Sequence, residues 1–218
     1  EPEEDPYYLC YSGGKDSALS LHKMLEQGHE AVGLLVMFNE GQGRSWFHGL
    51  DPALLDEVSG ALGIPLISCP SAGEDYHLAM EKGLRQAKTL GAEACVFGDI
   101  DIEGNRQWCV DRCNAVGLSC QHPLWQRSRA DNTRELLELG YKCFIKCVHN
   151  DLLPREYLGR TLDRGLIKEM EALGIDVCGE NGEYHTLAVD GPAFHSPVRF
   201  VCGKVLDFGN ISVIDIRA

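Results

Sequence analysis

Apolar positions along this chain fall into two alternating patterns, short continuous runs and longer stretches with helical spacing. The run at residues 31–38 is almost entirely apolar, which is typical of a strand covered on both faces. The stretch at residues 76–90 places its apolar side chains three and four positions apart, which predicts an amphipathic helix. The alternation of the two patterns predicts an α/β fold with a parallel, doubly wound sheet.

Glycine, proline and capping residues set the bounds of the predicted elements. A helix follows the first strand and ends at Gly28, and a second helix runs from its cap Asp51 to Gly63. Residues 39–49 form a polar loop at the carboxyl end of a strand, where open α/β sheets bind ligands. The predicted strands of this part are residues 7–11, 31–38, 65–69 and 94–97, and its later helices are residues 76–90, 104–117 and a helix from Asp131 or Thr133 to residue 139.

The pattern changes near residue 140. Strand-like runs at residues 141–148, 199–207 and 211–216 accompany one helical stretch, which follows Asp163 and extends to residue 173. We therefore divide the chain into residues 1–139, which hold the parallel sheet, and residues 140–218, which form a smaller C-terminal α+β lobe. The two parts are expected to pack rigidly around a cleft.

The most distinctive motif, named here the glycine loop (residues 12–17), has the sequence Ser-Gly-Gly-Lys-Asp-Ser and lies between a predicted strand and a predicted helix. Its glycines let the backbone approach a ligand, and the amides at the start of the helix favour an anion. Lys15 adds a positive charge, Ser12 and Ser17 add hydroxyl donors, and Asp16 can hold Mg²⁺ on a phosphate. The spacing is not that of the common P-loop, so the sequence predicts a phosphate-binding turn of another type.

A second polar motif, the polar turn (residues 179–186), has the sequence Gly-Glu-Asn-Gly-Glu-Tyr-His-Thr and leads into a predicted strand. Glu183 is the first choice for a general base that accepts a proton from ammonium or an attacking amine, and His185 is the second. Glu180 and Asn181 are expected to bind substrate or metal. On chemistry alone, a solvated hairpin turn is an equally good interpretation.

The glycine loop resembles the SGGxDS pyrophosphate loop of the PP-loop, or adenine nucleotide alpha hydrolase, superfamily. With the polar turn and residues 98–100, 123–125 and 158–160, the chain resembles the diphthine–ammonia ligase family of that superfamily. The resemblance implies a HUP-type, Rossmann-like nucleotide domain followed by a domain that holds the substrate. The family's diphthamide-forming members have a late signature close to GEGGEYET, whereas this chain has GENGEYHT, which resembles a bacterial subgroup.

The motifs and the resemblance together define the expected site. The expected cofactors are ATP and Mg²⁺, and the expected catalytic residues are Lys15, Asp16, Glu183 and His185. The residues expected to bind the nucleotide are Ser12, Gly13, Gly14, Lys15, Asp16, Ser17, Gly98 and Asp99, with Asp16 and Asp99 as the Mg²⁺ ligands. The residues expected to bind the substrate are Glu180, Asn181, Gly182, Glu183 and Thr186.

Composition narrows the class of protein. A formal net charge of −13 makes nucleic acid an unlikely partner, and no apolar run reaches the roughly 18 residues that suggest a membrane span. The acidic start lacks the basic and apolar regions of a signal peptide, so we expect a cytoplasmic protein with reduced thiols. Among ten cysteines there is no CxxC pair, and buried thiols are favoured over a zinc site built from Cys109 and Cys113 or from Cys143 and Cys147.

The leading functional hypothesis is an ATP-dependent, AMP-forming amide ligase. It would adenylylate a small-molecule or protein-borne carboxylate, release pyrophosphate and transfer ammonia, with a homodimer as a possible assembly. The resemblance to a bacterial subgroup adds corrinoid-salvage amidation as a second hypothesis. A third is PP-loop sulfur transfer to tRNA, which usually needs catalytic cysteines. A fourth is a nucleotide-binding regulator, which would not need the catalytic Lys15 and Asp16.

Overall fold

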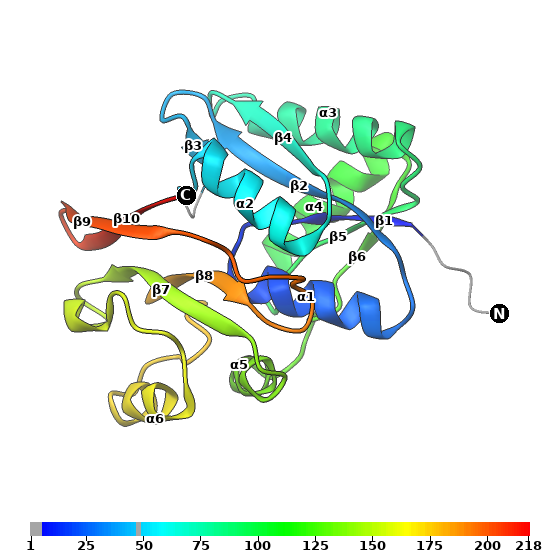
Figure 1. The fold of residues 1–218 in the computed structure, drawn as a ribbon. Coiled ribbons are helices and arrows are strands. Elements are labelled where there is room, and N and C mark those ends of the chain that lie inside the picture. The colour runs from blue at the N-terminus through cyan, green and yellow to red at the C-terminus, as the bar shows by residue number, and fades with distance from the viewer. Residues whose placement is uncertain (1–5, 47–48) are drawn as a thin grey trace.

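The computed structural model describes residues 6–46 and 49–218, so residues 47–48 of the predicted polar loop lie outside it. Five parallel strands form the central sheet in the order β4-β2-β1-β5-β6, and the short β3 (Arg44–Ser45) pairs antiparallel with the end of β2 (Figure 1). The parallel strands are β1 (Tyr7–Cys10), β2 (Ala31–Asn39), β4 (Leu66–Ser71), β5 (Ala94–Val96) and β6 (Ser119–Gln121).

Helices cover both faces of this sheet because the strands alternate their side chains between two cores. On one side, Leu34 and Val36 of β2 pack with α1 (Lys15–Glu26) and α2 (Pro52–Leu62). On the other side, Leu35 and Met37 pack with α3 (Tyr76–Thr89) and α4 (Glu103–Val116). The predicted doubly wound α/β sheet is thus confirmed.

The second part of the chain contains an antiparallel sheet with the order β8-β7-β10-β9 (Figure 1). Its strands are β7 (Lys142–His149), β8 (Tyr184–Asp190), β9 (Val201–Phe208) and β10 (Ile211–Arg217), accompanied by α6 (Arg164–Ala172) and the 3-10 turn η1 (Arg155–Tyr157). Ile145 and Leu187 of this sheet belong to the same apolar cluster as Leu9 of β1. The C-terminal α+β lobe therefore packs directly on the parallel-sheet domain, while the division after residue 139 stays a prediction.

Three details differ from the sequence-based expectation. Helix α5 (Arg129–Glu138) begins before Asp131, because the Ser128 hydroxyl caps it by accepting a hydrogen bond from the Asp131 amide. A two-residue strand, β3, forms within the predicted loop at residues 39–49. Leu173, expected on the apolar face of α6, lies at the end of that helix and is 53% exposed.

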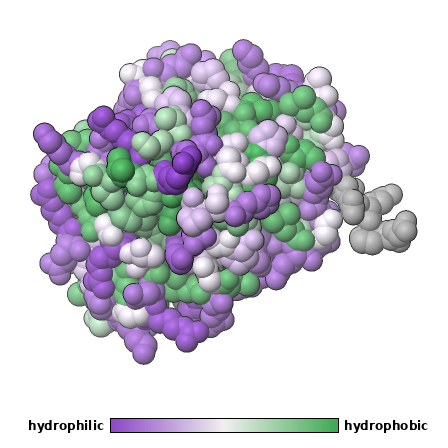
Figure 2. Space-filling model, in the orientation of Figure 1, coloured by the Kyte–Doolittle hydropathy of each residue, from purple (hydrophilic) through white to green (hydrophobic). Residues whose placement is uncertain are grey.

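Polar side chains cover much of the face shown in Figure 2, and apolar side chains also reach the surface at its left edge, near β9 and β10. The exposed apolar residues of this hairpin are Val201, Val205, Leu206, Phe208 and Ile211. Among the described helices, none combines the length and the apolar character needed to cross a membrane.

Candidate active site

The glycine loop lies at the point where the order of the parallel sheet reverses. It follows the carboxyl end of β1, which has β2 on one side and β5 on the other, and it leads directly into α1. In open α/β sheets, the crevice at such a switch point is where ligands bind. The fold therefore places the glycine loop in the crevice where ligands bind to sheets of this kind.

Hydrogen bonds between its own residues hold the glycine loop in shape. The Ser17 hydroxyl accepts from the Ser12 amide at 3.1 Å, and the two hydroxyl oxygens lie 2.9 Å apart. The Ser12 hydroxyl also accepts from the Gly14 amide at 3.3 Å. Gly13 has a φ of +92°, and a Cβ there would come within 2.8 Å of Leu50 Cδ1. The loop therefore requires glycine at position 13.

The C-terminal lobe brings the polar turn against the glycine loop. The Thr186 hydroxyl accepts a hydrogen bond from the Lys15 amide at 3.1 Å, and the Ala188 amide donates to the Gly13 carbonyl at 2.8 Å. The Lys15 ammonium also lies 5.8 Å from the centre of the Tyr184 ring. Two motifs more than 160 positions apart in the sequence thus lie in direct contact.

Opposite charges are concentrated at the junction of the two motifs. Lys15 is buried, and its ammonium lies 2.6 Å from a carboxylate oxygen of Asp16. Burial, the largest single effect, disfavours the charged form of Lys15, but Asp16 and the other acidic groups around it together outweigh burial and raise the pKa of Lys15. Burial, and then repulsion from Asp16, raise the pKa of Glu180 from 4.5 to about 7. Glu180 is therefore a carboxyl group that can exchange a proton near neutral pH.

Two cavities meet at the glycine loop. The larger, of about 540 Å³, lies over the ends of the parallel strands and has a wall formed by Trp46, Tyr76 and Trp108. These rings contact one another in sequence, with centroids 5.7 Å and 5.8 Å apart. Its volume is in the range of small-molecule sites, and its aromatic wall suits a flat ring system.

The smaller cavity, of about 340 Å³, lies between the glycine loop and the polar turn. Glu180 and His185 line it from the polar turn, and Lys15 lines it from the glycine loop. Burial, followed by the positive charges of Lys15 and Lys146, lowers the pKa of His185. His185 is therefore a neutral imidazole at neutral pH. Ser12, Asp16 and Asn105 line both cavities, so the two form one continuous site.

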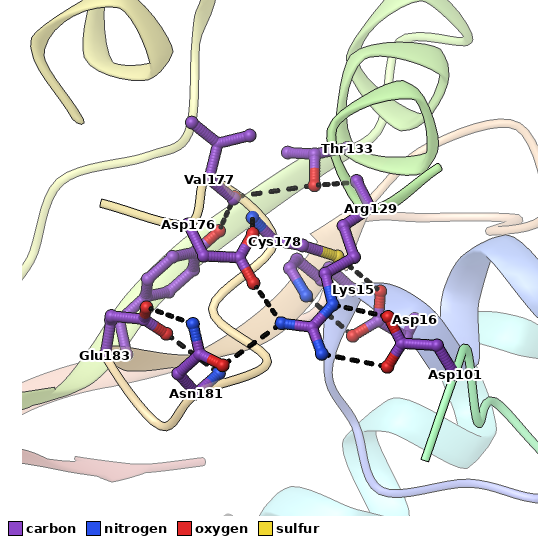
Figure 3. Close-up of polar contacts among 11 residues, drawn as sticks. Lys15, Asp16, Asp101, Arg129, Thr133, Asp176, Val177, Cys178, Asn181 and Glu183 are labelled. Atoms are coloured by element: carbon purple, nitrogen blue, oxygen red, sulfur yellow. Dashed lines mark hydrogen bonds and ion pairs between the residues drawn. The ribbon is translucent and has the colours of Figure 1, made fainter. Parts of the chain in front are cut away.

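Arg129 ties the polar turn to the parallel-sheet domain (Figure 3). Its guanidinium pairs with both carboxylate oxygens of Asp101, at 2.6 Å and 2.8 Å. It also contacts Asp176 at 2.7 Å and the side-chain oxygen of Asn181 at 3.1 Å. The sequence did not indicate this residue, because nothing in the local pattern shows which distant carboxylates an arginine will meet.

The two glutamates of the polar turn occupy different environments. Glu183 is 4% exposed, and its two carboxylate oxygens accept from the amide and the side-chain nitrogen of Asn181, at 3.0 Å and 3.1 Å (Figure 3). Glu180 instead lines the smaller cavity. The structure thus places Glu180, rather than Glu183, on the wall of the site.

The two carboxylates expected to share Mg²⁺ belong to different groups of side chains. Asp16 lies with Cys178 and Glu180, and Asp99 lies with Cys109 and His122, each group having its ligand atoms within 4.8 Å of one another. The Cys178 thiol lies 3.9 Å from Asp16, a contact that the sequence did not indicate. Carboxylate oxygens are the donors that Mg²⁺ prefers, so Asp16 fits this ion.

The fold and the site define an α/β protein with a glycine loop of the PP-loop type at the switch point of its parallel sheet. Two family models match the chain, the diphthamide synthase N-terminal domain at residues 8–120 and the diphthamide synthase C-terminal domain at residues 128–217. The chain therefore belongs to the diphthamide synthase family, which confirms the resemblance drawn from its motifs.

Curated relatives share about a quarter of their residues with this chain. The diphthine–ammonia ligase of Homo sapiens is 26% identical over 220 residues, covering 86% of this chain and 79% of the relative. That of Danio rerio is 25% identical with 86% and 83% coverage, and that of Saccharomyces cerevisiae is 24% identical with 86% and 33% coverage. A solved structure described as a predicted subunit of tRNA methyltransferase from Methanocaldococcus jannaschii aligns with a TM-score of 0.47 and 13% identity, over 88% of this chain and all of that one.

Proposed function

We propose that this protein is an ATP-dependent amide ligase, which adenylylates a substrate carboxylate and transfers ammonia to it. The observation that carries the proposal is the pair of cavities that meet at Ser12 and Asp16. A reaction in two half-steps needs a nucleotide and an acceptor on either side of one phosphate site. Membership of the diphthamide synthase family and relatives named diphthine–ammonia ligase support the same activity.

In this proposal each cavity has a separate role. The larger cavity holds the adenosine against the aromatic wall, and the glycine loop binds the phosphates through its amides and the Lys15 ammonium. The smaller cavity holds the acceptor carboxylate and ammonia. Asp16 would hold Mg²⁺, which neutralises phosphate charge when bound.

The proposed chemistry needs one group that stabilises negative charge on the phosphates and one group that accepts a proton. An oxygen of the acceptor carboxylate attacks the α-phosphorus of ATP, forming an acyl-adenylate and releasing pyrophosphate. Ammonia then attacks the acyl carbon, AMP leaves, and one proton is given up. Lys15 stabilises the negative charge on the phosphates, and orientation of the reactants in the two cavities supplies much of the remaining effect.

We assign the proton-accepting role to Glu180, with His185 as the second candidate. Glu180 lines the acceptor cavity, and its pKa of about 7 suits proton transfer at neutral pH. Glu183, the first choice from the sequence, uses both carboxylate oxygens to hold Asn181. We therefore propose that Glu183 fixes the polar turn.

The acceptor is proposed as a carboxylate on a small molecule or a protein, with diphthine as the first example because it is named in the relatives. His185 lines the acceptor cavity and departs from the family signature, so other carboxylates belong in the test. All ten cysteines are free thiols, which fits a reducing compartment such as the cytoplasm. A homodimer remains a prediction.

The test is to incubate the protein with ATP, Mg²⁺, ammonium and a panel of carboxylic acids. We expect AMP and pyrophosphate in equal amounts, together with an acceptor whose mass decreases as a hydroxyl is exchanged for an amino group. Lys15→Ala serves as the inactive control. Formation of ADP in place of AMP, or pyrophosphate release that no carboxylate stimulates, would refute the proposed reaction.

A further inference from the structure

A group of three potential metal ligands lies beside the larger cavity, which two of them line, and apart from the polar turn. Asp99 follows β5, His122 follows the neighbouring strand β6, and Cys109 faces them from α4. One Asp99 carboxylate oxygen lies 3.5 Å from Cys109 Sγ and 3.6 Å from His122 Nε2. The three ligand atoms all lie within 4.8 Å of one another.

His122 has an unmet polar atom that points into this group. Its side chain is only 5% exposed, and Nε2 is buried without a hydrogen-bond partner among the described residues. The Asp99 carboxylate, 3.6 Å away, is within ion-pair distance of Nε2 but too far for a hydrogen bond. Buried polar atoms are nearly always paired in native proteins, so an unpaired one indicates a ligand or ion that completes the site.

We propose that Asp99, Cys109 and His122 form a binding site for a borderline divalent metal ion, with Zn²⁺ as the best fit. Zinc–ligand bonds of roughly 2.0–2.3 Å at tetrahedral angles place neighbouring ligand atoms about 3.3–3.8 Å apart. The Asp99 oxygen lies 3.5 Å from Cys109 Sγ and 3.6 Å from His122 Nε2, so small shifts of these side chains would bring the group to zinc geometry. A thiolate, an imidazole and a carboxylate together select zinc over magnesium.

The surroundings of the group support this assignment. Cys120 Sγ lies 3.8 Å from His122 Nδ1, so the ring nitrogen that faces away from the site also has a partner. Three protein ligands leave a fourth position for water or a ligand atom, as in zinc sites that exchange ligands. Asp99 and Cys109 both line the larger cavity, so that position faces the proposed nucleotide. The chain would thus hold a hard ion at Asp16 and a softer one at Asp99.

The test measures metal binding by the full chain, independently of any ligase activity. The parent protein for this test is Cys202→Ser, which lacks the exposed thiol that could bind metal adventitiously, and every other variant is made in it. We expect the parent to bind one Zn²⁺ per chain by elemental analysis and competition titration. Cys109→Ser and His122→Gln should each weaken binding by more than about 100-fold, because changes outside the ligand shell already cost about 10–100-fold. Cys69→Ser, which changes a buried thiol elsewhere in the same core, should bind zinc as the parent does.

Cobalt provides a second measurement on the parent protein, so the test does not depend on the folding of a variant. We expect Co²⁺ to give a thiolate-to-cobalt charge-transfer band and the visible spectrum of a tetrahedral site, both removed by Zn²⁺. Sub-stoichiometric zinc, a cobalt spectrum without a thiolate band, or equal loss of binding in Cys69→Ser and Cys109→Ser would overturn the proposal. None of these outcomes bears on the formation of AMP, so this inference and the proposed ligase activity fail separately.

Discussion

Replacement of Glu180 by glutamine should lower activity and raise stability, and both effects follow from the raised pKa of this carboxyl group. Burial and then the nearby Asp16 raise the pKa of Glu180 from 4.5 to about 7. The folded protein therefore binds a proton more tightly than the unfolded chain does, and this favours folding below pH 4.5. That contribution is lost as the pH rises from 4.5 to about 7.

The size of the stability effect follows from the same shift. A shift of this size corresponds to at most about 3 kcal/mol of lost folding free energy at pH 8, since one pKa unit is about 1.4 kcal/mol. Glu180 is partly exposed, so screening by solvent reduces the effect to about 1–2 kcal/mol. Glu180→Gln removes the titration and should raise the midpoint of thermal unfolding at pH 8 relative to the parent. At pH 4 the two proteins should unfold at nearly the same temperature.

Glu180→Gln should lower the activity of the protein although it raises the stability at pH 8. If Glu180 accepts the proton released in ammonia attack, Glu180→Gln should lower amide formation by about 10²-fold or more, the scale of losing a general base. At constant free ammonia, the parent rate should rise about ninefold from pH 6 to pH 8, because the ionised fraction of a group with a pKa near 7 rises from about a tenth to nine tenths. The variant should lose this dependence while keeping its ATP affinity. Normal turnover in the variant, or an unchanged pH profile, would refute the assignment.

Three further variants test the other parts of the site. Lys15→Ala should abolish turnover and weaken ATP binding by about ten- to a hundredfold, which is the scale of one charge-assisted hydrogen bond. Calorimetry measures the change in ATP affinity. Lys23→Ala, further along α1, is the control and should change neither turnover nor ATP binding. In Arg129→Lys the ammonium cannot reach all the partners of the guanidinium, so KM for the acceptor should rise while ATP affinity stays the same. Arg134→Lys on the same helix is the control. Equal effects of the two variants would contradict the role of Arg129 in holding the polar turn. Glu183→Gln removes one acceptor for Asn181 and should lower amide formation less than the substitution at position 180, with the pH profile kept. A larger loss would return the role of base to Glu183.

Local sequence signals predicted the order of the elements because each one is decided by neighbouring residues. Asp51 caps α2 and Gly63 ends it in a left-handed conformation, as their positions indicated. The start of α5 was placed too late because Ser128, Asp131 and Thr133 can all cap a helix, and the local sequence does not rank them. Which of the three residues caps the helix depends on the backbone geometry of the folded chain.

The site was predictable where a motif is continuous and not where it depends on distant contacts. The glycine loop and the polar turn carry their chemistry within a few residues. Which glutamate of the polar turn faces the cavity depends on its backbone, where Gly179 and Gly182 have φ values of +72° and +89°. The residues of the proposed metal site, Asp99, Cys109 and His122, have no regular spacing in the sequence. Two adjacent parallel strands and a helix bring it together.

The contacts between the two motifs make the shape of the proposed phosphate site depend on the C-terminal lobe. The Lys15 amide is bonded to the Thr186 hydroxyl, and the Gly13 carbonyl accepts from the Ala188 amide. Both bonds involve backbone groups of the glycine loop, so a shift of β8 would move the loop. Because Thr186 ends the polar turn and Ala188 follows it closely, an acceptor that orders this turn would also position the phosphates. The structure therefore links the two proposed half-reactions through the backbone of the glycine loop, in addition to placing their cavities side by side.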